Sequence, residues 1–166
     1  MMKKLLMILL VFICCCGCNN REDKLIMVTE AAFAPYEYYS DGKIVGVDVE
    51  IAKEIAKELG KELVIKDVAF DSIIHEVKSG KADIGVAGIS YSEERAKSVD
   101  FSDNYASSKQ VVLVRDESNI SGVKDIKDKK IAVQLGSVAD MYVSEEYNAK
   151  NIKEIRDISE QTEKKL

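Results

Sequence analysis

Short apolar runs alternate in this chain with segments whose apolar residues recur every three or four positions, and this alternation limits the folds open to it. The run at residues 25–29 predicts a buried strand. Ile51, Ile55 and Leu59 recur with helical spacing, and Asp48 can cap the helix that carries them. The alternation predicts an α/β fold with parallel strands and helices on both faces of the sheet. Further strands are expected at 63–68, 82–86, 110–115, 131–134 and 154–158, and further helices at 71–79, 123–126, 137–147 and from Ser159 onward.

The end of the third expected strand combines small residues with a cation. Ala87, Gly88 and Ser90 let a ligand come close to the backbone. Ser92 is a predicted helix N-cap, and Arg95 follows one turn inside the helix. Backbone amides at a helix start and a forked guanidinium suit a small planar carboxylate, so this segment is a candidate carboxylate site. The alternative is a surface ion pair between Arg95 and one of the acidic residues Glu93, Glu94 and Asp100.

Composition excludes several other classes of site. The four cysteines of the 166-residue chain all lie at positions 14–18, so the rest has neither a disulfide framework nor a cysteine metal site. The one histidine, His75, is expected on a solvated helix face. No metal and no cofactor are therefore expected. The net charge is −5 and no basic stripe is present, which argues against a nucleic-acid partner.

The first 17 residues are predicted to be a targeting segment. Two lysines precede an apolar run at 5–13, which is too short to span a bilayer, and a cysteine cluster follows. The pattern resembles a bacterial lipoprotein signal peptide that is cleaved before a cysteine. Cys18 is the expected lipidation site because the small Gly17 precedes it, with Cys16 as the alternative, and residues 18–23 form a polar tether. A plain secretory signal is the other interpretation.

Four parts of the chain carry a resemblance to a known family. They are a strand and aromatic loop at 24–47, the small-residue segment 87–90, the sequences SEERA at 92–96 and VDFSD at 99–103, and a strand with a glycine turn at 131–137. In this order and spacing they resemble the extracytoplasmic solute-binding proteins of polar amino-acid ABC transporters, family 3. The resemblance covers residues 24–142.

The resemblance implies a two-lobed periplasmic-binding-protein type 2 fold with open, mostly parallel sheets. Lobe one is expected at 24–106, the first hinge crossing at 107–109 and part of lobe two at 110–166. Members of the family are usually much longer than 166 residues. The second lobe and the return crossing are therefore expected to be incomplete, and a non-functional fragment is one interpretation.

The candidate site lies where parallel strands end, because ligands bind beyond the carboxyl ends of such strands. In the family that the chain resembles, the arginine matching Arg95 holds the ligand α-carboxylate, and the backbone at Ser90 assists. The resemblance also implies that Phe33 and Phe70 enclose the ligand side chain and that Glu30 meets its polar tip. Amides at Gly136, Ser137 and Val138 of lobe two would add donors. The alternatives are core packing for the two phenylalanines, a solvated loop position for Glu30 and a helix cap for Ser137.

These features predict a binding protein and not an enzyme. It is expected to be a lipid-anchored monomer in the periplasm or at the cell surface that passes an amino acid to an ABC permease. A carboxylate facing two aromatic rings favours arginine or lysine, then glutamine, then histidine. One alternative is a dehydratase of cyclohexadienyl acids such as prephenate or arogenate, in which Glu30 would donate a proton. Another is the sensory module of a receptor.

Overall fold

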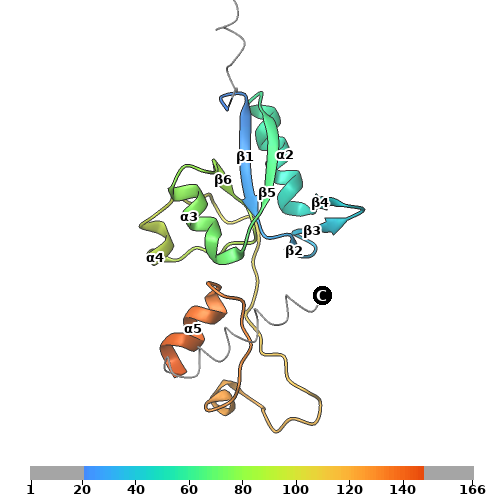
Figure 1. Cartoon of the computed structure of the whole chain (residues 1–166). Coiled ribbons are helices and arrows are strands. Elements are labelled where there is room, and N and C mark those ends of the chain that lie inside the picture. The colour runs from blue at the N-terminus through green and yellow to red at the C-terminus, as the bar shows by residue number, and fades with distance from the viewer. Residues whose placement is uncertain (1–20, 148–166) are drawn as a thin grey trace, which may run out of the picture.

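The computed structural model describes residues 21–147, and the parallel strands and the helices up to residue 96 alternate in the predicted α/β order (Figure 1). In chain order they are β1 (Lys24–Thr29), β2 (Ala32–Phe33), β3 (Glu37–Ser40), β4 (Lys43–Val45), α2 (Val47–Glu58), β5 (Glu62–Asp67), η1 (Phe70–Ser72), α3 (Ile73–Lys78), β6 (Ile84–Gly85), α4 (Glu93–Ala96), η2 (Val123–Ile126) and α5 (Val138–Tyr147).

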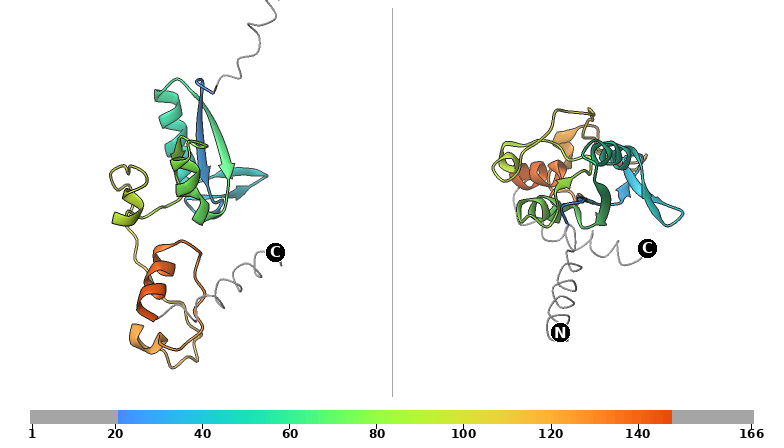
Figure 2. Two further views of the ribbon diagram at one scale, coloured as in Figure 1. Left: turned by 60° about the vertical axis from the view of Figure 1, so that its left-hand side comes forward. Right: turned by 90° about the horizontal axis from the view of Figure 1, so that it is seen from above.

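The main sheet is parallel, with the strand order β5-β1-β6. Successive residues of β1 point to opposite faces of this sheet. Met27 packs with Val49 of α2 on one face, whereas Val28 packs with Ile73 of α3 on the other. The sheet is therefore covered by a helix on each side, as the alternating pattern predicted (Figure 2). Only the third strand is markedly shorter than expected, two residues in place of 82–86.

A second, antiparallel sheet of β2, β3 and β4 lies in the segment that was expected to be an aromatic loop. Its strands β3 and β4 are joined by Asp41 and Gly42, which both have positive φ, 50° and 73°. Such a two-residue turn matches the twist of a hairpin, and Asp-Gly is a strong sequence signal for it. The hairpin was missed because its strands are too short to show a clear alternation.

Helix α2 begins through backbone contacts and not through a side-chain cap. Its N-cap residue is Gly46, and the amides of Val47 and Asp48 donate to the carbonyl oxygens of Pro35 and Tyr36, at 3.1 and 3.0 Å. The prediction that Asp48 caps the helix is wrong. The close approach of the two backbones requires glycine at position 46, since a Cβ there would lie 2.1 Å from the Tyr36 carbonyl oxygen.

Residues 102–115 form an extended connection without helix or strand, and this connection leads to η2 and α5 (Figure 1). The strands expected at 110–115 and 131–134 are absent, because a strand needs a neighbouring strand to take its backbone hydrogen bonds and the described residues offer none there. The strand at 154–158 and the helix from Ser159 fall outside the described residues. The lobe boundaries stay predictions.

The part of the chain that the structure describes contains no helix long and apolar enough to cross a bilayer. Within the same range, no three His, Cys, Asp or Glu side chains are grouped so that they could hold a metal ion.

Candidate functional site

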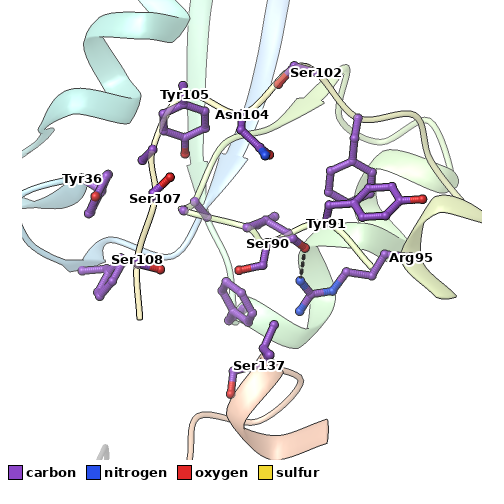
Figure 3. Close-up of a pocket in the computed structure, with 18 of the residues that line it drawn as sticks. Tyr36, Ser90, Tyr91, Arg95, Ser102, Asn104, Tyr105, Ser107, Ser108 and Ser137 are labelled. Atoms are coloured by element: carbon purple, nitrogen blue, oxygen red, sulfur yellow. Dashed lines mark hydrogen bonds between the residues drawn. The ribbon is translucent and has the colours of Figure 1, made fainter. Parts of the chain in front are cut away.

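A cavity of about 440 Å³ lies at the carboxyl ends of the parallel strands, next to the start of α5 (Figure 3). Its lining comes from β2 and β3, from η1 and α4, from the loop after β6, from the extended connection, and from the turn before α5 and the first residue of α5. Every predicted ligand-binding residue except Glu30 and Gly136 contributes to this lining. These residues are Phe33, Phe70, Ala87, Gly88, Ser90, Arg95, Ser137 and Val138.

Arg95 lies at the centre of this arrangement. The Ser92 hydroxyl accepts a hydrogen bond from the Arg95 backbone N–H at 3.2 Å, so Ser92 is the N-cap of α4 as predicted. The guanidinium donates to the carbonyl oxygen of Ser90 at 2.6 Å (Figure 3) and to that of Gly136 at 2.8 Å. Its carbon also lies 5.8 Å from the centre of the Phe70 ring, within the range of a cation–π contact.

The charge of Arg95 is partly shielded from water. Burial lowers the pKa of the guanidinium, and the charge of Glu94 opposes this shift. An arginine remains protonated under such conditions because its ordinary pKa is so high. Within the described residues its direct side-chain hydrogen bonds go to backbone carbonyls and not to the acidic residues considered as surface partners. A guanidinium has five N–H donors, so donors remain for a carboxylate.

The turn before α5 meets the strand ends of the main sheet. Gly136 has a positive φ of 74°, and a Cβ on it would lie 3.0 Å from the Cβ of Asp71. Its N–H donates to Asp140, and the Asp140 N–H donates to the Ser137 hydroxyl at 3.1 Å. Ser137 therefore does cap α5, and it also lines the cavity.

The two phenylalanines differ in their surroundings. Phe33 is 51 % exposed and stacks on Tyr36, with 5.3 Å between ring centres. Its ring also lies against Gly88, where a Cβ would come within 3.2 Å of it. Phe70 packs against the buried cluster around Val28 while it lines the cavity. Core packing and a place in the cavity are thus combined in Phe70, whereas Phe33 lies outside the buried core.

Glu30 lies beside the cavity and not in its lining. Its carboxylate accepts a hydrogen bond from the side-chain amide of Gln134, and Gln134 does line the cavity. This bond and the Arg95–Gly136 bond connect residues more than a hundred and about forty positions apart in sequence. Together they connect the strand ends of the main sheet to the segment before α5.

Three polar residues of this region, Glu37, Asp48 and Tyr105, were not predicted as site residues from the sequence. Glu37 lines the cavity although it is only 1 % exposed, and burial, reinforced by Asp48, raises its pKa to about 9. Asp48 is fully buried and accepts hydrogen bonds from the Gly88 N–H and the Tyr105 hydroxyl. No local pattern marks these residues, because each acts through partners that are distant in sequence.

Comparison with known proteins identifies the family. The model of the bacterial extracellular solute-binding proteins, family 3, matches residues 25–165. The arginine-binding extracellular protein ArtP of Bacillus subtilis (strain 168) is 38 % identical over 122 residues, which are 74 % of this chain and 48 % of that protein. The L-arginine-binding protein of Pseudomonas aeruginosa is 30 % identical over 134 residues, 80 % of this chain and 52 % of that protein.

Solved structures give the same result for the fold. The arginine-bound form of truncated ArgBP from T. maritima superposes with a TM-score of 0.71 at 40 % identity, over 75 % of this chain and 60 % of that one. An ancestral arginine-binding protein bound to arginine superposes with a TM-score of 0.70 at 42 % identity, over 74 % and 55 %. The chain spans about half the length of the curated relatives it matches. It has the α/β periplasmic-binding fold of type 2, and it belongs to the bacterial extracellular solute-binding proteins of family 3.

Proposed function

We propose that this chain captures a cationic amino acid outside the cytoplasmic membrane and presents it to the permease of an ABC importer. The observation that carries the proposal is the placement of Arg95 in the cavity, with two N–H groups fixed by the carbonyls of Ser90 and Gly136. These bonds hold the guanidinium in one orientation and leave donors for an α-carboxylate. No covalent step is required of a protein with this role.

The walls of the cavity suit the side chain of such a ligand. Phe33 and Phe70 both line the cavity. Glu30 lies beside the cavity, where its carboxylate accepts a hydrogen bond from the side chain of Gln134. An ammonium or guanidinium can lie against aromatic rings and pair with a carboxylate at its tip. The relatives whose names state arginine binding are consistent with this preference.

Calorimetry should rank the ligands of the full chain in the order arginine or lysine, then glutamine, then histidine. The contact between a cation and the aromatic rings contributes about 0.5–2 kcal/mol, so the neutral glutamine should bind about twofold to about thirtyfold more weakly than arginine. Leucine and glutamate serve as controls, because one lacks a polar tip and the other carries the wrong charge. A preference for either control would contradict the proposed cationic ligand.

Lipid attachment at Cys18 is a second part of the proposal. Stable anchoring requires more than one hydrocarbon chain, so a processed lipoprotein should sediment with membranes and incorporate labelled palmitate. Replacing Cys18 with serine should abolish both signals, whereas Cys16→Ser should leave them intact. If only Cys16→Ser abolishes them, the modified residue is Cys16. If the unchanged chain gives neither signal, it is not a lipoprotein.

A second candidate function follows from Glu37. A carboxyl group that keeps its proton at neutral pH and lines a cavity is suited to donate a proton to a leaving hydroxyl. Glu37 lines the cavity, whereas Glu30, the proton donor that the sequence suggested for a dehydratase, lies beside it. An assay for product formation from prephenate separates the two functions, since a binding protein forms none.

A further inference from the structure

One buried carboxyl group, that of Asp48, connects two segments of the cavity wall. They are the loop after β6, called the ligand loop below, and the extended connection. The Oδ2 atom of Asp48 accepts a hydrogen bond from the Gly88 N–H at 2.7 Å and another from the Tyr105 hydroxyl at 3.0 Å. Gly88 lies in the loop after β6 and touches Phe33, whereas Tyr105 lies at the start of the segment that leads away from the main sheet. Asp48 itself is fully buried in the first turn of α2.

Glu37 is a second buried acid in this region, and Asp48 is its side-chain hydrogen-bond partner. Among the described residues, neither Asp48 Oδ1 nor Glu37 Oε2 has an N–H or O–H donor, although both atoms are buried. Such atoms are rarely left without a hydrogen. A proton on Glu37 satisfies both, because the protonated carboxyl group donates to Asp48. Two charged carboxylates side by side would instead repel each other in a site that water does not reach.

The groups that face Glu37 favour this proton. Asp48 acts on it from α2 and Glu30 from the loop after β1, and both are acidic. Tyr105 faces the same pair from the extended connection. Its pKa is raised by burial and then by the charge of Asp48, so its hydroxyl keeps its proton and remains a donor in alkaline solution.

We propose that Glu37 and Asp48 share one proton and act together as positioning residues, which hold the ligand loop at Gly88 and the connection at Tyr105 in the geometry that binds the ligand. The proposal rests on the binding function proposed above. Loss of the shared proton leaves two adjacent buried charges, so the Asp48 carboxylate moves away from Glu37 and its bonds to Gly88 and Tyr105 are disrupted.

The pH dependence follows from the direction of proton linkage. The ligand-bound state keeps the proton, whereas the free protein loses it as the pH rises through the pKa of Glu37, about 9. Affinity is therefore constant below this pH and falls about tenfold per pH unit above it. Between about pH 8 and about pH 10, the affinity should fall about tenfold for this reason alone.

The first test is calorimetry with arginine at pH 8 and pH 10 on the full chain and on its Glu37→Gln variant. The amide of glutamine donates a hydrogen without titrating, so its affinity should lack the tenfold fall. The titration of the free arginine ligand and of other side chains changes the affinity of both proteins equally. The ratio of the two affinities therefore reports only the titration of Glu37. Glu58→Gln, at an exposed position of α2, is the matched control and should follow the unchanged protein. A ratio that stays constant between the two pH values overturns the proposal.

The second test does not depend on any ligand. Asp48→Ala removes the acceptor of the Gly88 N–H, so hydrogen exchange of the Gly88 amide should accelerate at least tenfold near neutral pH. Amides in β1 should keep their protection, which distinguishes this local change from unfolding. Unchanged exchange at Gly88 overturns the proposal. If arginine fails to bind the unchanged chain at either pH, the binding function is wrong, and the exchange experiment still decides whether Asp48 positions the loop.

Discussion

Replacing Gly46 with alanine should destabilise the folded chain by about 3 kcal/mol or more, the largest effect on stability that we expect from a single methyl group. The residue has φ 129°, a conformation that side chains rarely adopt. The added Cβ would lie 2.1 Å from the carbonyl oxygen of Tyr36 and 2.8 Å from that of Pro35. Both atoms belong to the backbone that receives the first amides of α2, so neither can move without loss of those hydrogen bonds.

Chemical denaturation of the two proteins measures this effect. Gly60→Ala is the matched control, because Gly60 also has a positive φ, 64°, but has open space around its Cβ position. The control should lose only about 1 kcal/mol, the ordinary strain of a left-handed residue. Equal losses in the two variants would show that the contact with Tyr36 does not matter.

Replacing Arg95 with lysine should weaken binding of arginine by about thirtyfold or more, which corresponds to about 2 kcal/mol. Lysine keeps the charge but has no fork, so it cannot donate to the carbonyls of Ser90 and Gly136 and also present two parallel N–H groups to a carboxylate. The midpoint of thermal unfolding without ligand should change little, because the ammonium retains the charge and one hydrogen bond.

The comparison requires calorimetry with arginine and thermal unfolding of the ligand-free proteins. Arg115→Lys is the matched control, since Arg115 is exposed and does not line the cavity. It should leave both affinity and midpoint unchanged. An Arg95→Lys protein that binds normally but unfolds earlier would assign Arg95 a structural role only.

The parts of the fold that the sequence predicted are those with local causes. Strands β1 and β5 and helices α2 and α5 are each marked by the spacing of their own apolar residues, and Ser92 is a cap because of the residues directly after it. The strand expected at 110–115 is absent because a strand depends on a partner, which no local pattern supplies. The hairpin of β3 and β4 carries a local turn signal in Asp41 and Gly42, but its strands are too short for a clear alternation.

The candidate site also contains residues that the sequence predicted and residues that it did not. The convergence of Phe33, Phe70 and Arg95 on one cavity follows from a rule of topology, since parallel strands end at the same edge of a sheet. Asp48 was expected to cap a helix, whereas its carboxylate serves residues that follow it by 40 and 57 positions. The raised pKa of Glu37 depends on its burial and on its neighbour Asp48. Such long-range partners become visible only in three dimensions.

The extended run that follows Tyr105 affects how this chain behaves at high concentration. Val111 is 84 % exposed and Leu113 is 97 % exposed, in a run of four apolar residues that belongs to no sheet in the described part of the chain. An extended apolar segment of this kind can pair with the same segment of another molecule and begin β-aggregation. We therefore expect this short connecting segment to limit the solubility of the protein, and Leu113→Lys should raise the concentration at which it stays monomeric.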